Sequence, residues 1–352
     1  PGVPDFGQKI TIRHLLTHRS GLRDWDAGLG LAGRPIESGI TQDDVLAFVS
    51  RQKSLNFPPG SQQNYSNTNY SLLAVAVEKA SGKPFEQFLT DEIFAPLKMS
   101  AVSAASPNAP IDHMAQSFRG RFPAPYAASV KPISTVGASA VYASLDDMIA
   151  WIRTIRDRRA GGTSVAWARF LAPAKSPDTE DYAYGLWRNA RSGSPFLGHL
   201  GLAAGYRISF RYFTSRDLGV VYMTNDGNDA AYDRAKQIED LFLGIPEKAF
   251  EPPDAEYTPA PAIEDAAQFS GRFGSDELQT AYDLVAQGKR LVARHRINGE
   301  IELTRVDGDA FTSRFPFMPD VRFRRNASGV VDAMIVSTES AQNIIFSRVP
   351  GY

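Results

Sequence analysis

Apolar residues recur at helical spacing in several stretches of the first 245 residues. Ile12, Leu15 and Leu16 predict a short helix, and Thr41 is a suitable N-cap for the next one. A glycine-rich stretch that contains Pro35, residues 28–39, predicts a loop between the two. The predicted helices are 10–18, one that begins at Thr41, 69–81, 84–97, 145–155 and 229–243.

Three strand-like stretches lie between the last two of these helices, over 182–188, 205–214 and 218–224. Turn signals separate them at Ser192-Gly193 and at residues 215–217. Strands that follow a helical region and are closed by one more helix are typical of an α+β domain with an antiparallel sheet. Residues 1–250 are therefore predicted to form one α+β domain, in which helices flank the sheet.

The pattern changes after a proline-rich segment, residues 251–262, which predicts an extended and semi-rigid linker. Beyond it, short alternating stretches are separated by turns rich in glycine, asparagine and aspartate. About eight strands at this spacing predict a small antiparallel β-barrel over 263–352. The predicted strands are 269–273, 280–286, 290–296, 300–305, 310–315, 321–325, 330–337 and 343–349.

Composition removes several classes of function from consideration. Among 352 residues, 38 basic side chains balance 39 acidic ones, so the net charge of −1 provides no long-range field for nucleic acid. The absence of cysteine excludes disulfides, thiolate catalysis and cysteine-bound metal, and it fits either side of a bacterial inner membrane. No apolar run approaches the roughly 18 residues that a membrane span requires.

The stretch Phe57-Pro58-Pro59-Gly60 to Tyr70 is the first candidate for chemistry. A Pro-Gly turn leads into Tyr65-Ser66-Asn67, which ends where an apolar helix begins. A phenol can act as a general base when nearby cations lower its pKa, and an asparagine amide can orient a substrate carbonyl or an ammonium. Taken alone, the stretch fits a helix N-cap loop with a packed tyrosine better than it fits a site.

The stretch Gly198-His199-Leu200-Gly201-Leu202 is the second candidate, and it lies next to a predicted strand. Gly201 would let a substrate lie close against a strand edge. A backbone N–H at such an edge could form half of an oxyanion hole. Taken alone, His199 is better explained as a surface or packed histidine in a glycine-rich turn.

The order of these stretches resembles that of the β-lactamase-related serine hydrolases, which include class C β-lactamases, DD-peptidases, D-aminopeptidases and esterases. In that family, Leu-Leu-Thr-His-x-Ser-Gly-Leu precedes a Pro-Gly turn and then Tyr-x-Asn, as residues 15–22 precede Tyr65 here. Further matches in the same order are Ile93 to Met99, Ser144 to Met148, Tyr184-Gly185-Leu186 and the His-x-Gly stretch. The resemblance covers about residues 1–245, and the tail over 263–352 resembles the lipocalin-like or other small β-barrels that some members carry after the hydrolase domain.

The resemblance implies a β-lactamase/transpeptidase-like domain and a role for each matching residue. Tyr65 matches the family's catalytic tyrosine and Asn67 its substrate-orienting asparagine. His199 stands where many members have the lysine of Lys-Thr-Gly, and Leu202 matches the strand N–H that joins the oxyanion hole. It implies a small-molecule or peptide substrate, no metal and no cofactor. Among compartments it favours the periplasm or secretion, and the oligomeric state stays open.

The sequence departs from the family pattern at two places, and both departures bear on which activity of the family the chain could have. Histidine in place of lysine removes a constant cation for a substrate carboxylate, which fits the peptidase and esterase branches better than a β-lactamase. The family's nucleophilic Ser-x-x-Lys precedes the Leu-Leu-Thr-His stretch, and the chain begins too late to contain it. Ser50-Arg51-Gln52-Lys53 has the right residues in the wrong order and is expected on a solvated helix face.

The sequence therefore predicts a serine hydrolase that cleaves an ester or amide through an acyl-enzyme and whose nucleophile lies on a segment outside this chain. The chain alone is expected to be inactive. One alternative is a non-catalytic, penicillin-binding-like pseudoenzyme, and another is a class C-like β-lactamase. A zinc site on His14 and His18 is a weaker alternative, because Leu15 and Leu16 stand where such a site needs glutamate.

Overall fold

The computed structural model describes residues 2–35, 38–100, 102–104, 111–120, 126–129, 135–159, 182–228, 230–246 and 261–351. By its contacts the chain divides into two compact units. The first contains the described residues of Pro1–Ile10, Ser20–Asn69 and Pro252–Tyr352, and the second those of Thr11–Arg19 and Tyr70–Glu251. The predicted boundaries 1–250 and 263–352 stay a prediction, because the linker lies largely outside the described residues.

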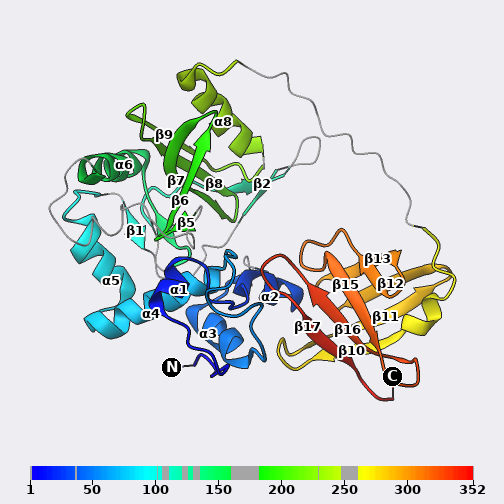
Figure 1. Ribbon diagram of the computed structural model, residues 1–352. Coiled ribbons are helices and arrows are strands. Elements are labelled where there is room, and N and C mark those ends of the chain that lie inside the picture. Colours follow the sequence, from blue (N-terminus) through cyan, green and yellow to red (C-terminus); the bar gives the residue numbers. More distant parts are fainter. Residues whose placement is uncertain are drawn as a thin grey trace. The chain divides into compact units, whose positions relative to one another are not determined.

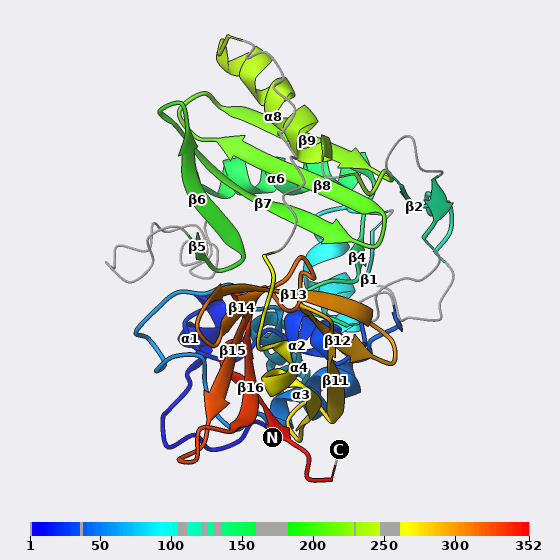
Figure 2. The ribbon, with the colours of Figure 1, turned by 90° about the vertical axis from the view of Figure 1, so that its right-hand side faces the viewer.

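A five-stranded antiparallel sheet forms the centre of the second unit, in the order β5-β6-β7-β8-β9 (Figure 1). The strands are β5 (Tyr182–Ala183), β6 (Leu186–Arg191), β7 (Ser194–Ala203), β8 (Tyr206–Phe213) and β9 (Leu218–Thr224). Helices α6 (Leu145–Arg159) and α8 (Ala230–Leu243) cover its two faces (Figure 2). This arrangement confirms the predicted α+β class with helices flanking an antiparallel sheet.

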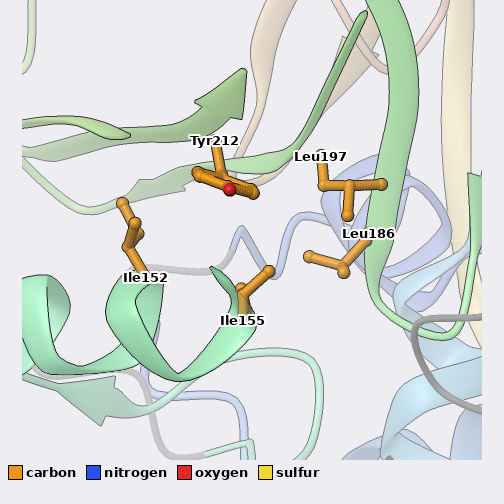
Figure 3. Close-up of a cluster of buried hydrophobic side chains, with 5 residues drawn as sticks. All are labelled: Ile152, Ile155, Leu186, Leu197 and Tyr212. Atoms are coloured by element: carbon orange, nitrogen blue, oxygen red, sulfur yellow. The ribbon is translucent and has the colours of Figure 1, made fainter. Parts of the chain in front are cut away.

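Cross-strand partners identify the residues that face each helix. Leu197 pairs with Tyr212, and both pack with Ile152 and Ile155 of α6 (Figure 3). The neighbouring Arg211 points the other way and forms an ion pair with Glu239 of α8. Alternate residues of β7 and β8 therefore face opposite sides, as the two-residue period of a strand requires.

Shorter elements complete the second unit. They are α1 (Ile12–Leu16), most of α4 (Asn67–Ser81), α5 (Phe85–Leu89), the π-helical η2 (Thr90–Phe94), and the strand pairs β1 (Ser103–Ala104) with β4 (Val141–Tyr142) and β2 (Phe118–Arg119) with β3 (Ala127–Ala128). The helices confirm those predicted over 10–18, 69–81 and 84–97, with shorter bounds for the first. No helix in the described part of the chain has both the length and the apolar character needed to cross a membrane.

The first unit combines two helices with a closed eight-stranded antiparallel barrel (Figure 1). Its elements are α2 (Trp25–Leu31), α3 (Gln42–Arg51), the 3-10 helix η3 (Ala266–Phe269), β10 (Gly271–Ser275), β11 (Thr280–Gln287), β12 (Arg290–His295), β13 (Gly299–Asp307), β14 (Ala310–Thr312), β15 (Asp320–Arg325), β16 (Val331–Ser337) and β17 (Ile344–Arg348). The eight predicted strands are thus confirmed. Pairing of β10 with β17 closes the barrel, and no strand edge is left in it.

Aromatic side chains fill the barrel interior. The rings of Phe269 and Phe323 lie 4.7 Å apart, and Phe311 and Phe273 lie 5.3 and 6.1 Å from the ring of Phe323. All four side chains are buried. The barrel is therefore a packed core, and its strands support the loops outside it.

Three elements differ from the sequence prediction. The strand predicted over 182–188 is interrupted at Tyr184-Gly185, where both residues have positive φ, and forms β5 and β6. Residues 28–31, expected to form a loop, lie in α2, because the glycines there allow close packing: a Cβ on Gly28 would lie 2.4 Å from the ring of Phe48. Residues 194–203, expected as a turn-rich approach to a strand, form β7 itself. Pro195, Gly198 and Gly201 hid this strand, since proline and glycine are depleted in strands.

Candidate functional site

The Ser-Gly-Leu end of the first motif is bonded to the start of α4 in the first unit. The Ser20 hydroxyl donates to Asn69 Oδ1 at 2.5 Å. The Thr68 hydroxyl donates to the carbonyl of Arg23 at 2.7 Å and accepts from the backbone N–H of Trp25 at 3.0 Å. Two motifs more than 40 residues apart in the sequence are therefore joined by buried hydrogen bonds.

Asp24 lies at the centre of this arrangement. Its Oδ2 accepts from both the backbone N–H of Asn67 at 2.9 Å and Asn67 Nδ2 at 3.0 Å. Its Oδ1 accepts from the backbone N–H of Asp26 at 2.8 Å, as the N-cap of α2. One carboxylate thus satisfies the first turns of two helices, where aligned peptide dipoles favour a negative charge.

Burial sets the electrostatics of this carboxylate. Asp24 is 4% exposed, and loss of water raises the pKa of its carboxyl group, against hydrogen bonds from Asn67 and Asp26 that lower it. Sequence reasoning missed Asp24, although an aspartate directly before a short apolar run is an N-cap signal. Its bond to Asn67 Nδ2 fixes the amide plane and leaves Oδ1 as the acceptor at the other end of the group.

Tyr65 lies in the loop before α4, and its side chain is 36% exposed. Partial withdrawal from water raises the pKa of its phenol to about 12, and the negative charge of Asp24 adds to this rise. The phenol is therefore protonated near neutral pH. A role as general base requires a cation nearby to lower this pKa.

His199 lies on β7 in the second unit, within a cluster of rings. The ring of Tyr182 lies 5.6 Å from that of His199, 4.5 Å from that of His18 and 4.8 Å from that of Trp187. The Tyr70 ring, 5.1 Å from His18, belongs to the same cluster. His18 comes from the Leu-Leu-Thr-His motif and is buried, so this motif packs against the sheet that carries His199.

The hydrogen bond from Nδ1 selects the tautomer of a neutral His199. Nδ1 lies 2.5 Å from the carbonyl oxygen of Leu200, and a carbonyl can only accept, so Nδ1 carries the hydrogen. Nε2 lies 3.2 Å from the hydroxyl of Tyr182, which then donates to it. Burial lowers the pKa of His199 below its usual value of 6.5, which agrees with a neutral ring near pH 7.

We expect the ring of His199 to titrate below pH 6.5, as followed by 15N chemical shifts. The Tyr182→Phe variant should raise this pKa, because the hydroxyl that donates to the neutral ring is lost. Since the native pKa is lowered, the contribution of His199 to stability is present above about pH 6.5 and is lost as the pH falls toward the native pKa. Tyr232→Phe, which removes a bond to the Gly201 carbonyl instead, is the control and should leave the pKa unchanged. A fully charged His199 at pH 7 would contradict the assignment.

The register of β7 directs its backbone groups. Arg191 and Ser194 flank a two-residue loop, so they form a hydrogen-bonded pair between β6 and β7. From Ser194 onward, the backbone groups of successive β7 residues point alternately toward β6 and toward β8, up to the last pair with β6, which is Trp187 with Gly198. Beyond that pair, the same alternation points the N–H of Leu202 away from β8 and toward the side of β6. On that side, no described strand pairs with residues 199–203 of β7.

Gly201 and its neighbours shape this end of β7. A Cβ on Gly201 would lie 2.3 Å from Ile208 Cγ2 on β8, so the strand pair leaves no room for a larger residue. The Gly201 carbonyl accepts from the hydroxyl of Tyr232 in α8 at 2.7 Å. The side chain of Leu202 is 55% exposed. This end of β7 is thus fixed by packing. Among the described residues, no strand pairs with its edge on the side away from β8.

Several alternatives from the sequence have structural roles. Ser50 is exposed in α3 and donates to the carbonyl of Ala47 at 2.9 Å, as expected of a solvated helix face. His14 Nδ1 accepts from the Thr11 N–H in the capping box of α1, and His18 packs among the rings. Within the described residues, no group of three or more His, Asp or Glu could hold a metal ion. The two histidines therefore serve different purposes.

The candidate residues fall into two groups. Tyr65 and Asn67 lie with Asp24 in the first unit, and His199, Gly201 and Leu202 lie on β7 in the second. Their meeting in one pocket stays a prediction. Asp24 and Tyr182, which the sequence did not single out, hold one member of each group.

Comparison with known families gives one match over most of the chain: a family model described as Beta-lactamase covers residues 2–243. The chain is 30% identical over 249 residues to a D-aminopeptidase of Gluconobacter oxydans (strain 621H), across 69% of this chain and 47% of that protein. It is 29% identical to a D-aminopeptidase of Brucella ovis over a similar share, 69% and 47%. The chain spans about half the length of the curated relatives it matches.

Solved structures share the fold at lower identity. A penicillin-binding protein homologue from Pyrococcus abyssi, described as octameric, matches with a TM-score of 0.56 at 19% identity, over 97% of this chain and 78% of that one. A D-amino acid amidase from Ochrobactrum anthropi SV3 matches with a TM-score of 0.54 at 21% identity, over 67% and 71%. At these identities the likeness concerns the fold alone.

Proposed function

Because the chain belongs to the beta-lactamase family, we propose that it forms most of a serine hydrolase that cleaves small amides or esters through an acyl-enzyme. The observation that carries the proposal is the buried Asp24 carboxylate, which holds Asn67 two residues after Tyr65. D-Aminopeptidases among the relatives favour amides and peptides of D-amino acids as the substrate class.

The reaction needs a serine and a lysine that we place, as part of the proposal, in a Ser-x-x-Lys element before Pro1. The serine oxygen attacks the substrate carbonyl, and its proton passes by way of lysine and Tyr65 to the leaving amine as the C–N bond breaks. Water then attacks the acyl ester, the bond between the serine oxygen and the acyl carbon breaks, a proton from water returns to the serine oxygen, and the carboxylic acid is released. The lysine ammonium would lower the pKa of Tyr65 from about 12 toward the working range.

The remaining residues bind and orient the substrate in this proposal. The free Oδ1 of Asn67 would accept from the lysine or from the substrate, and the N–H of Leu202 would stabilise the oxyanion. A neutral His199 provides no fixed positive charge for a substrate carboxylate. This favours neutral amides and esters over β-lactams and carboxylate-ended peptides.

Substrate comparison on the longer natural protein tests the proposal. We expect release of ammonia from D-amino acid amides, or hydrolysis of small p-nitrophenyl esters, at rates well above that of nitrocefin. Faster turnover of nitrocefin would favour the class C-like β-lactamase. No turnover, together with an upstream sequence that lacks Ser-x-x-Lys, would favour the non-catalytic binding protein.

Labelling tests the position of the nucleophile. A fluorophosphonate probe should modify the longer protein at the serine of Ser-x-x-Lys and should leave residues 1–352 unmodified. Covalent labelling of any serine within these residues, mapped by mass spectrometry, would overturn the assignment of the nucleophile to an upstream segment.

A further inference from the structure

The turn between β16 and β17 is bonded to both loops that carry the candidate residues of the first unit. We call this turn, residues 338–343, the barrel turn. The carbonyl of Ser340 in it accepts from the backbone N–H of Asp24 at 2.8 Å. The carbonyl of Glu339 accepts from Asn64 Nδ2 at 2.9 Å, and Asn64 directly precedes the proposed catalytic tyrosine. The barrel thus contacts the chain next to both groups.

The side chain of Asn56 forms two hydrogen bonds with the same turn. Its Nδ2 donates to the carbonyl of Ser340 at 3.0 Å, and its Oδ1 accepts from the backbone N–H of Gln342 at 2.9 Å. Its own backbone N–H donates to the carbonyl of Gly21 at 2.7 Å. One side chain therefore links the barrel turn to the stretch that leads into Asp24.

The barrel turn has a fixed shape of its own. The backbone N–H of Thr338 donates to the carbonyl of Ala341 at 2.9 Å, and the N–H of Ala341 donates back to the Thr338 hydroxyl at 2.9 Å. The N–H of Asn343 donates to Ser337 Oγ at 2.9 Å, and Ala341 is 1% exposed. Because hydrogen bonds within the turn fix its conformation, the turn can hold a loop that is bonded to it in one position.

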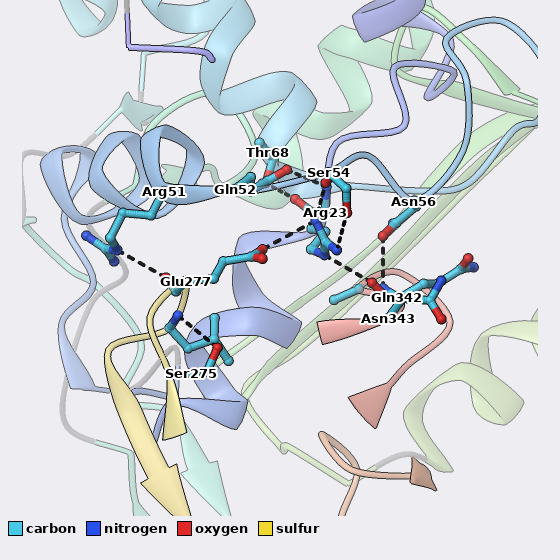
Figure 4. A network of polar contacts seen from close by, with 12 residues as sticks. Arg23, Arg51, Gln52, Ser54, Asn56, Thr68, Ser275, Glu277, Gln342 and Asn343 are labelled. Atoms are coloured by element: carbon cyan, nitrogen blue, oxygen red, sulfur yellow. Dashed lines mark hydrogen bonds and ion pairs between the residues drawn. The ribbon is translucent and has the colours of Figure 1, made fainter. Parts of the chain in front are cut away.

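Arg23, the residue before Asp24, is a second link to the barrel. Figure 4 shows its guanidinium between Glu277 and Gln342. Nη1 lies 3.3 Å from Glu277 Oε1 and Nε donates to the carbonyl of Gln342 at 3.1 Å, while Nη2 donates to Ser54 Oγ at 3.0 Å. The side chains of Arg23 and Glu277 are almost fully buried. Removal of either side chain would leave the other charge buried and uncompensated, so loss of one partner is expected to be strongly destabilising.

We infer that the barrel turn is a positioning element of the active site, which acts through Asn56 and Asp24 to hold Asn67 and the Tyr65 loop in their reactive geometry. The inference rests on the proposed function. It assigns the barrel a positioning part in the reaction, through the bonds of its turn to Asp24, Asn56 and Asn64. Misplacement of a catalytic group by about 1 Å can cost on the order of a hundredfold in rate, so the bonds to the turn are large enough to matter.

Substitution of Asn56 in the longer natural protein tests the inference. Asn56→Ala should lower kcat on a D-amino acid amide by roughly tenfold to a hundredfold, with KM within about twofold, since the substrate itself does not contact this residue. It should also speed hydrogen exchange at the N–H of Asn67, which is bonded to Asp24. Asn56→Asp keeps the acceptor for the Gln342 N–H and should give an intermediate loss.

Asn298→Ala is the matched control at the same interface. Asn298 also joins the barrel to the helical segment, through bonds from its Nδ2 to the carbonyls of Gly30 and Leu31 at 3.1 and 3.3 Å, away from Asp24. We expect it to leave kcat and the exchange of the Asn67 N–H close to wild type. Equal losses in both variants, or a normal kcat in Asn56→Ala, would overturn the inference. An inactive wild-type protein would instead refute the proposed function.

Discussion

Tyr65→Phe is expected to lower kcat on an amide substrate, in a protein that includes the proposed Ser-x-x-Lys segment, by about 10²–10⁴-fold, the usual contribution of a positioned proton-transfer group. The variant keeps the ring and removes only the hydroxyl. Because the Tyr65 side chain is 36% exposed, removal of its hydroxyl should change the midpoint of thermal unfolding by no more than a few degrees. Steady-state kinetics and calorimetry on the same preparation separate the two effects.

Tyr126→Phe provides the matched control, since Tyr126 is also exposed, at 50%, and has no part in the proposed reaction. It should keep wild-type kcat. A Tyr65→Phe variant with kcat near that of wild type would remove the phenol from the mechanism and leave Tyr65 as a packed loop residue.

Asp24→Ala is expected to lower the free energy of unfolding by about 2–4 kcal/mol, because it removes the buried carboxylate that accepts from partly buried N–H donors at the first turns of two helices. The donors are the backbone N–H groups of Asn67 and Asp26 and the Nδ2 of Asn67, all within 3.0 Å of the carboxylate. Activity should be lost with stability, since Asn67 loses its anchor. Urea denaturation followed by circular dichroism gives the change in free energy.

Two comparisons show whether burial of this carboxylate causes the effect. Asp44 also caps a helix, but its side chain is 26% exposed and is paired with Arg34, so Asp44→Ala should cost no more than about 1 kcal/mol. Asp24→Asn keeps an acceptor and removes the charge whose burial raises the carboxyl pKa, so it should be less destabilising than Asp24→Ala. A smaller loss in Asp24→Ala than in Asp44→Ala would contradict the central role of Asp24.

Local patterns were sufficient to predict the barrel from the sequence. Its strands alternate buried and exposed residues, as in β15, where Val321 and Phe323 are buried and Arg322 and Arg324 are exposed, and turn residues such as Asn298-Gly299 mark strand ends. The capping residue Thr41 likewise predicts the start of α3, where its hydroxyl accepts from the backbone N–H of Asp44. Each of these signals lies within a few residues of the element that it defines.

The missed elements depend on contacts between distant residues. Gly28 lowers the helix propensity of α2 and is used because Phe48, 20 positions later, packs against it. The glycines of β7 are similar, since Gly201 gives space to Ile208 on the next strand. A single sequence shows the glycine but not the neighbour that requires it, so the local interpretation as a loop or turn was wrong at both places.

The same limit applies to the candidate site. Tyr65, Asn67 and His199 could be proposed because they lie in short motifs that the family arranges in a fixed order. Asp24 could not, because its function depends on Asn67, 43 residues later, and on the carbonyl of Ser340 in the barrel turn. Residues that hold a catalytic group in place are thus harder to find than the group itself.

A crystal structure of a protein that includes the proposed Ser-x-x-Lys segment, after reaction with a phosphonate ester, tests the account most directly. We predict one pocket in which the phosphonylated serine lies within hydrogen-bond distance of the Tyr65 hydroxyl, with one phosphonate oxygen accepting from the N–H of Leu202 and His199 lining the same cavity. Tyr65 and His199 on opposite sides of the molecule, or a phosphonate bound far from both, would contradict it.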